Sequence, residues 1–291
     1  MIWLILSIFA VSGIFIMFKI IDKTSTPLLY ALVINYLIAG IIGFIYTQSF
    51  NINEIFNADW FLIGIIIGIL FIVTFFILGI STRKAGLSVS TVASKMSVVL
   101  TIIFSIVVFK EAVSVIKIIA IIMAIAAVFL CVFEKKRGAK KTKIIYLFLP
   151  FILFLGMGAV DSLVSFSQHT FPDLKDNMIS AKFTSTAFGC SFIFGLIYTF
   201  FKPKELKNYV RKNTIIYGVI LGLINFASIY FVIRTYNSEI LSNSSVIGIV
   251  NISCVACSVI LGRFIFKEKL SLINYIGIIL ALITIILLNF A

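Results

Sequence analysis

Two ionisable residues stand inside long apolar segments of this 291-residue sequence. Lys95 lies nine residues into one such segment, and Asp161 lies in the middle of another. A charge at the centre of a bilayer costs between about 2.5 and 17 kcal/mol, depending on the method, so it is seldom accidental. Lys95 is predicted to anchor the carboxylate or other anionic group of a small solute. The alternatives are a fixed ion pair and a lysine that snorkels towards the interface.

Asp161 is the natural counter-charge to Lys95. Left unpaired in apolar surroundings, its carboxylate would readily take up a proton, which makes Asp161 a candidate proton carrier. Paired with Lys95 or Lys182, it would stay ionised and structural. Lys182 is the second candidate for coupling, although it lies only about six residues into its segment, where snorkelling costs little.

Uncharged polar residues recur at helical spacing near these charges and in two later segments. Such a stripe is suited to a wet cavity, although hydroxyl and amide side chains also bond neighbouring membrane helices at about 0.6–2 kcal/mol per bond. Both interpretations stay open for each residue. The predicted substrate-binding set is Thr91, Ser94, Lys95, Asp161, Ser165, Asn225, Ser228 and Asn251.

Motifs for other chemistry are weak or missing. Cys254 and Cys257 have zinc-like spacing but no second ligand pair, so we interpret them as packing residues and predict no metal and no cofactor. His169 is the only histidine and falls after an apolar segment, where a surface role is expected and pH sensing is the alternative. The chain has no H-E-x-x-H, G-x-S-x-G or Walker A pattern, so we predict that it is not an enzyme.

The elements that must hold these residues are membrane helices. The chain is 62% hydrophobic and 12% charged, against about 45–50% and about 25% in soluble domains. Its apolar runs of about 20 residues match a bilayer, and they lack the alternation of barrel strands. We therefore predict an all-α membrane protein with ten transmembrane helices, at 2–21, 27–47, 60–81, 86–109, 114–133, 144–168, 177–201, 213–234, 239–265 and 271–290.

Internal repeats divide these helices five and five. The segments 109–114 (FKEAVS) and 266–271 (FKEKLS) share one pattern, and paired glycines recur at Gly64/Gly68 and Gly218/Gly222, where close helix packing is expected. We place the first repeat at 1–138 and the second at 139–291, around the basic stretch 134–143. Because five is odd, the two halves enter the membrane from opposite sides. Such inverted repeats place a solute site near the midplane.

Lysine and arginine are distributed unequally between the two sides. Eighteen fall in the loops of one side and four on the other. Since cytoplasmic loops carry the excess of positive charge, both termini are predicted to lie outside the cell. A cell membrane, specifically a bacterial inner membrane, is the expected location. The net charge of +13 is therefore a membrane feature and does not indicate a nucleic-acid partner.

These features resemble the drug/metabolite transporter superfamily, specifically its EamA-type ten-helix members. The resemblance covers essentially the whole chain and rests on the helix count, the duplication, and Glu111 and Glu268 just before the fifth helix of each half. It implies a secondary transporter, often an exporter of amino acids or other metabolites, with a cavity lined largely by helices one, three, four, six, eight and nine. A proline common in the middle of helix four is replaced here by the polar stretch 95–97.

The predicted function is secondary active transport, with export of a small metabolite such as an amino acid by alternating access, driven by protons or exchange. The expected partners are this small-molecule substrate and the lipid bilayer, and the chain is either a monomer or a homodimer. The main alternative is a non-transporting scaffold or sensor, which would pack solid and lock Lys95 and Asp161 in a dry bridge. An intramembrane enzyme is the weakest reading.

Overall fold

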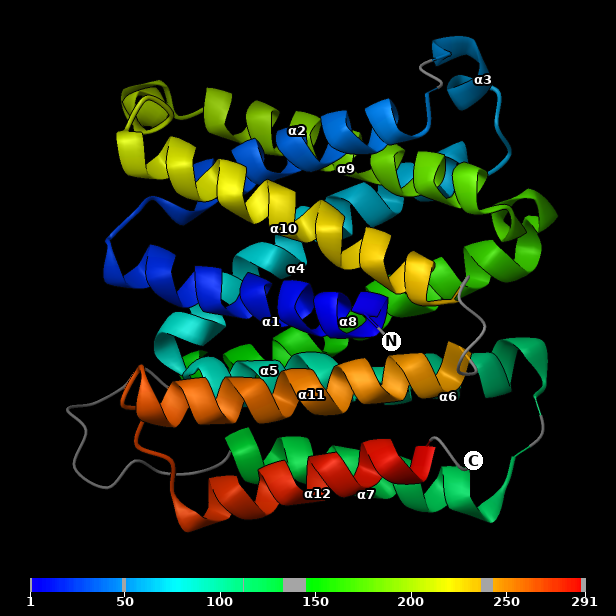
Figure 1. Ribbon diagram of the computed structural model, residues 1–291, viewed down its shortest axis with the longest axis vertical. Coiled ribbons are helices and arrows are strands. Elements are labelled where there is room, and N and C mark those ends of the chain that lie inside the picture. Colours follow the sequence, from blue (N-terminus) through cyan, green and yellow to red (C-terminus); the bar gives the residue numbers. More distant parts are fainter. Residues whose placement is uncertain (1, 49–50, 112, 133–144, 237–242, 289–291) are drawn as a thin grey trace.

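The computed structural model describes residues 2–48, 51–111, 113–132, 145–236 and 243–288, and within these ranges every regular element is helical (Figure 1). The all-α prediction is therefore confirmed for this part of the chain. The predicted boundary between the halves, at 138/139, lies outside the described residues. The elements are α1 (Ile2–Lys23), α2 (Leu28–Tyr46), α3 (Ile52–Phe56), α4 (Phe61–Lys84), α5 (Leu87–Met96), α6 (Val98–Phe109), α7 (Val115–Val132), α8 (Ile145–Thr170), η1 (Pro172–Lys175), α9 (Asn177–Phe200), η2 (Pro203–Asn208), α10 (Lys212–Tyr236), α11 (Asn243–Phe264) and α12 (Leu272–Leu288).

Eight helices in the described ranges are long and apolar enough to cross a membrane, with α5 and α6 counted together. Two further apolar helices, Val115–Cys131 and Leu272–Leu288, are shorter and occupy the ranges predicted for the fifth and tenth helices. Each predicted range thus holds an apolar helix. Ten membrane crossings and inverted halves stay predictions.

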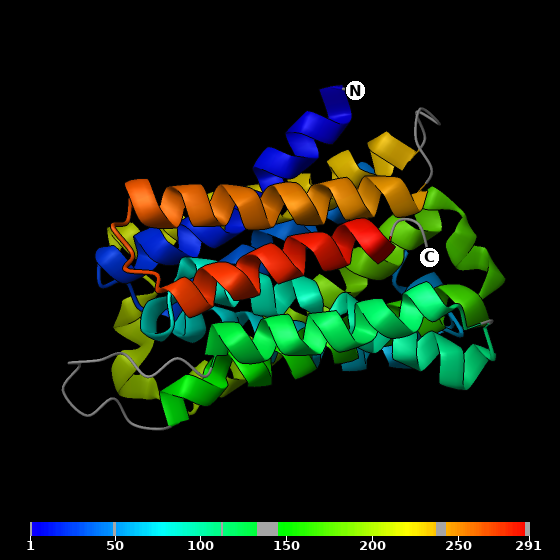
Figure 2. The same cartoon turned by 90° about the horizontal axis from the view of Figure 1, so that it is seen from below.

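The helices lie side by side in a bundle (Figure 1). The helix α2 packs against α9 and α10, α4 packs against α8 and α9, and α1 packs against α10 and α11. The helices α7 and α12 pair with each other and lie nearest the viewer in Figure 2. The largest apolar core joins α1, α2 and α4 and includes Phe18, Leu32, Tyr36, Phe75 and Leu78. Because lipid replaces water around such a bundle, close packing is a main source of its stability.

Glycines bring several helices into backbone contact. A Cβ at Gly68 would lie 2.6 Å from the Cβ of Cys190 in α9, and one at Gly218 would lie 2.7 Å from the Cβ of Ile34 in α2. At Gly222 the carbonyl oxygen of Asn35 would be 2.8 Å away. At Gly64, in contrast, the nearest atom would be 3.6 Å away. Close packing therefore requires glycine at three of the four predicted positions.

The range 86–109 was predicted as one continuous helix and is divided at Ser97 into α5 and α6. The Ser97 hydroxyl lies 2.6 Å from the backbone carbonyl oxygen of Ser94, one turn earlier. A serine that bonds back to this carbonyl competes with the backbone and can bend or interrupt a helix. The interruption thus falls in the polar stretch 95–97, two residues after Lys95.

The two ends of the bundle differ in charge. One end, which we call the basic end, contains the last turns of α1, α4 and α11, together with η2 and the start of α10. Its cationic residues include Lys23, Arg83, Lys84, Lys204, Lys212 and Arg263. The other end, called the opposite end, contains α3, η1, the end of α6, the first turn of α1 and the last turn of α12 (Figure 1).

Candidate functional site

A polar cavity of about 400 Å³ lies among α5, α6, α8 and α11. It is bounded on one side by the α5–α6 break and on the other by the middle and end of α8. Its lining residues are Ser94, Lys95, Ser97, Val98, Thr101, Met157, Asp161, Val164, Ser165, Gln168, Ile247 and Asn251. A cavity with apolar walls and a few convergent polar groups is the usual form of a small-molecule site.

Lys95 and Asp161 both line this cavity but do not form an ion pair. The described ion pairs within 4.0 Å involve other residues. Asp161 Oδ2 lies 3.1 Å from the hydroxyl oxygen of Ser97, and the Lys95 ammonium lies 5.9 Å from the centroid of the Phe15 ring. Both charges are therefore available to a molecule in the cavity.

Two further hydroxyls in the lining have no hydrogen-bond partner among the described residues. The side-chain oxygens of Ser94 and Thr101 are buried and have no hydrogen bond in the described structure. A buried hydroxyl without a partner carries a desolvation penalty of about 1–3 kcal/mol. A bound solute or water in the cavity would remove that penalty.

Small residues on α8 let neighbouring helices approach the cavity wall. A Cβ at Gly156 would meet the Thr74 side chain of α4 at 2.8 Å, and one at Gly158 would meet Leu100 of α6. This close approach positions α6, and with it the Ser97 break, directly against the face of α8 that carries Asp161.

Five of the eight predicted substrate-binding residues lie on this cavity: Ser94, Lys95, Asp161, Ser165 and Asn251. The other three do not. Thr91 is fully buried and its hydroxyl donates to the carbonyl oxygen of Leu87 at 2.9 Å. Asn225 donates to the side-chain oxygen of Asn35 at 3.2 Å, and the Ser228 hydroxyl donates to the backbone of Asn225.

Lys182, the second candidate for coupling, lies away from the cavity. Its ammonium is 3.0 Å from the carboxylate of Glu54 in α3. The Lys182 side chain is 16% exposed, and that of Glu54 is 56% exposed, which places the pair at the rim of the bundle. A direct pair between Lys182 and Asp161 is therefore not formed.

Sequence reasoning missed three polar residues of the lining: Ser97, Thr101 and Gln168. The signal was present, because Ser94, Ser97 and Thr101 continue one stripe at spacings of three and four residues. Gln168 likewise extends the stripe that starts at Asp161 and Ser165. Following the first stripe for two more turns and the second for one more turn would have found all three.

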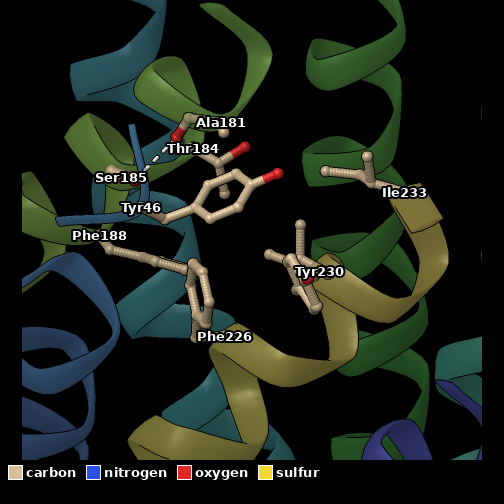
Figure 3. A pocket seen from close by; sticks show the side chains of 9 residues that line it. Tyr46, Ala181, Thr184, Ser185, Phe188, Phe226, Tyr230 and Ile233 are labelled. Atoms are coloured by element: carbon tan, nitrogen blue, oxygen red, sulfur yellow. Dashed lines mark hydrogen bonds between the residues drawn. The ribbon is translucent and has the colours of Figure 1, made fainter. Parts of the chain in front are cut away.

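Two other hollows are less suited to a polar solute. Figure 3 shows a small pocket among α2, α9 and α10, bounded by Tyr46, Phe188, Phe226 and Tyr230, with a volume of about 20 Å³. That volume is close to one water molecule. A second hollow of about 430 Å³, along α2, α3 and α9, is walled almost entirely by apolar side chains.

Helices of membrane-spanning length around a polar cavity define a multi-pass membrane protein. Residues 1–133 match the model of the EamA-like transporter family, which confirms the resemblance to the drug/metabolite transporter superfamily. That family consists of membrane transporters of small molecules and is generally non-enzymatic.

Two further comparisons extend beyond the first half of the chain. A Haemophilus influenzae protein described as uncharacterized is 27% identical over 219 residues, which are 74% of this chain and 71% of that protein. A crystal structure of another protein superposes with a TM-score of 0.60 at 13% identity, covering 98% of this chain and 94% of the other. The second likeness shows a shared fold over nearly the whole length.

Proposed function

We propose that this protein is a secondary active transporter that exports a small polar metabolite, such as an amino acid, by alternating access. The observation that carries the proposal is the polar cavity that both Lys95 and Asp161 line, with neither residue in an ion pair within the described part of the chain. A zwitterionic solute would place its carboxylate at Lys95 and its ammonium at Asp161. The solute would thus bring a direct ion-pair partner to each of these two side chains.

The contacts between helices support an arrangement of two inverted five-helix halves. The contact of α1 with α10 has a counterpart in α8 with α4, and that of α2 with α10 has a counterpart in α9 with α4. The pairs α2–α9, α7–α12 and α5–α11 would join equivalent helices across the interface. The polar cavity is lined by α5, α6, α8 and α11, so it lies beside the α5–α11 contact. A site between the two halves is expected of transporters built from inverted repeats.

Proton coupling through Asp161 is part of this proposal. The Ser97 hydroxyl has one hydrogen and two acceptors in reach, the Ser94 carbonyl and the Asp161 carboxylate. When Asp161 is ionised, Ser97 donates to it. When Asp161 is protonated, Asp161 donates to Ser97, whose hydrogen is then free for Ser94. Protonation would thereby change the bonding at the α5–α6 break, which adjoins the solute.

A scaffold or sensor is the alternative function. That function predicts closely packed helices without a cavity, with Lys95 and Asp161 in an ion pair from which water is excluded. The cavity volume and the absence of this pair from the described ion pairs favour transport instead.

The proposal is tested by solute counterflow in proteoliposomes. Purified protein is reconstituted, loaded with one unlabelled metabolite at a time, and supplied with the same metabolite in labelled form outside. A transporter accumulates label transiently, whereas a scaffold or sensor does not. No counterflow across the amino acids and related small metabolites would contradict the proposal.

A further inference from the structure

Glu268 precedes α12 and is bound by residues of α1 and α5. Its carboxylate accepts hydrogen bonds from the backbone N–H groups of Leu87, at 2.6 Å, and Ser88, at 3.2 Å, which are the first two residues of α5. The Ser88 hydroxyl donates to it at 3.1 Å, and the ammonium of Lys19 lies 3.0 Å away. Free N–H groups and the helix dipole both stabilise a carboxylate at a helix N-terminus. Glu268 thus ties α1 and α5 to the α11–α12 connection at the basic end.

This contact is nearly buried and closely fitted. The side chains of Lys19 and Glu268 are 14% and 10% exposed. Gly86, just before α5, has a φ of +112°, a left-handed value that favours glycine, and a Cβ there would lie 3.3 Å from the carboxylate oxygens of Glu268. A Cβ at Gly262 would lie 2.8 Å from one of the same oxygens. Two glycines therefore make room for this carboxylate.

Glu111 occupies the same position as Glu268 in the other FKE segment. The lysines that precede the two glutamates have the same left-handed backbone, with φ values of 54° at Lys110 and 53° at Lys267. Their phenylalanines also correspond. Phe266 lies 4.8 Å beneath the ammonium of Lys23, at the end of α1.

The phenylalanine of the first segment makes the equivalent contact at the opposite end. Phe109 contacts His169, near the end of α8, with ring centroids 4.0 Å apart. The two FKE segments thus share a backbone conformation and a neighbouring helix end. They differ in the exposure and the contacts of the glutamate.

Glu111 is exposed, whereas Glu268 is nearly buried. The Glu111 side chain is 50% exposed, and its partner within ion-pair range is Lys117 of the following helix α7, at 3.8 Å. The two ends of the polar cavity also differ in exposure, and the more exposed end is the one nearer Glu111. The cavity extends from Lys95 towards the opposite end, where Gln168 is exposed. Towards the basic end, Thr91 and Ser88 are fully buried.

We infer that Glu268 and Glu111 hold the two ends of the cavity closed in turn, an inference that rests on the proposed transport function. We call each of these glutamate contacts a latch. With Glu268 bound to α5 and Lys19, the basic end is closed and the opposite end is open. In the other state Glu268 releases α5, and Glu111 binds the N-terminus of α11, the counterpart of α5. Because each glutamate binds a helix of the other half, rocking the halves would engage one latch as it frees the other.

Cysteine labelling tests this exchange. In a background with Cys131, Cys190, Cys254 and Cys257 replaced by alanine, Thr91→Cys reports on the basic end and Gln168→Cys on the opposite end. A water-soluble maleimide is added to purified protein in detergent, so both ends meet the reagent. Rates are compared in the parent, in Glu268→Gln and in the matched variant Glu111→Gln.

Reciprocal changes are expected. Glu268→Gln weakens a charge-assisted contact and should speed labelling at Thr91→Cys about tenfold while slowing it at Gln168→Cys. Glu111→Gln weakens the other latch, so it should leave Gln168→Cys fast and not speed Thr91→Cys. An increase at both positions with Glu268→Gln would show general loosening and overturn the inference. So would no change at either position, or equal effects of the two variants.

Two further measurements keep the result decisive. Lys19→Gln and Ser88→Ala weaken the same latch from its other side and should reproduce the effect of Glu268→Gln, with size-exclusion profiles confirming that each variant is folded. Labelling requires no solute, so it is independent of the counterflow assay. Reciprocal labelling without counterflow supports the latch and contradicts transport, whereas counterflow without reciprocal labelling contradicts the latch alone.

Discussion

Lys95 of α5 and Asp161 of α8 line the same cavity, and neither belongs to an ion pair among the described residues. Inside a bilayer this arrangement is costly, because neither charge is neutralised by a direct ion pair. Ser97 partly compensates on one side, since its hydroxyl lies 3.1 Å from the Asp161 carboxylate. The remaining cost is the physical basis for expecting an occupant.

Replacing Lys95 should remove anion binding without unfolding the protein. We expect Lys95→Ala to weaken binding of a carboxylate-bearing solute about 10- to 100-fold, the effect of losing a charge-assisted hydrogen bond. Thermal stabilisation by solutes found in the counterflow screen measures this effect. Lys182→Ala is the matched control, because that ammonium lies 3.0 Å from Glu54 and away from the cavity. A solute that stabilises the parent and Lys95→Ala equally would contradict this assignment.

Replacing Asp161 should separate proton drive from exchange. Asp161→Asn keeps the size of the side chain and can still bond Ser97, but it cannot take up and release a proton. We expect counterflow to persist with a higher KM, because the solute's ammonium loses its charged partner, while acceleration by an imposed pH gradient disappears. Asp173→Asn, on an exposed residue of η1, serves as the control. Unchanged proton-driven flux in Asp161→Asn would remove Asp161 from the coupling mechanism.

The paired glycines of α4 should differ in their tolerance of a methyl group. Gly68→Ala would bring a Cβ to 2.7 Å from the carbonyl oxygen of Ala187, so we expect it to lower the free energy of unfolding by about 1–3 kcal/mol. Gly64→Ala meets its nearest atom only at 3.6 Å and should be neutral. Thermal unfolding in detergent compares the two. Equal destabilisation would contradict the close contact of α4 with α9 at Gly68.

Asn225 should act on stability and not on binding. Its side chain donates to Asn35 in a fully buried contact between α10 and α2, so Asn225→Ala should lower the free energy of unfolding by about 1–2 kcal/mol. The double variant Asn35→Ala/Asn225→Ala should lose less than the sum of the single losses. Solute affinity should not change. Weaker binding with intact stability would return Asn225 to the substrate site.

The loop charges predict the direction of insertion. A C-terminal fusion to a reporter that is active only outside the cytoplasm should be active, and one that is active only inside should be silent. Changing the cationic residues of η2 and the start of α10 to neutral residues should reduce this bias. Activity of the cytoplasmic reporter in the unchanged protein would reverse the orientation.

Much of the architecture was predictable because its cause is local. A run of about 20 apolar residues has to be helical in a bilayer, since each backbone N–H and C=O must be bonded within the segment. Helix positions and the all-α class follow from that rule. The match of residues 1–133 to the EamA-like transporter family agrees with the resemblance inferred from the FKE segments.

The site was predictable only in part, because sequence shows a polar residue but not its partner. Lys95 and Asp161 were identified by their cost in a membrane, and both lie on the cavity. Asn225 and Ser228 carry the same kind of signal, yet they bond Asn35 and the backbone of α10. Spacing alone cannot distinguish a hydroxyl that faces a cavity from one that bonds a neighbouring helix.

The sequence by itself determined that this chain enters a membrane as apolar helices, that most of its lysines and arginines fall in the loops of one side, and that Lys95 and Asp161 are exceptional. Only the tertiary structure decided that these two residues share a cavity without pairing, that Ser97 interrupts the helix beside them, and that Glu268 is nearly buried while Glu111 is exposed. The reason is physical. Hydropathy and helical periodicity act along the chain, whereas ion pairing and cavity formation depend on which helices pack together.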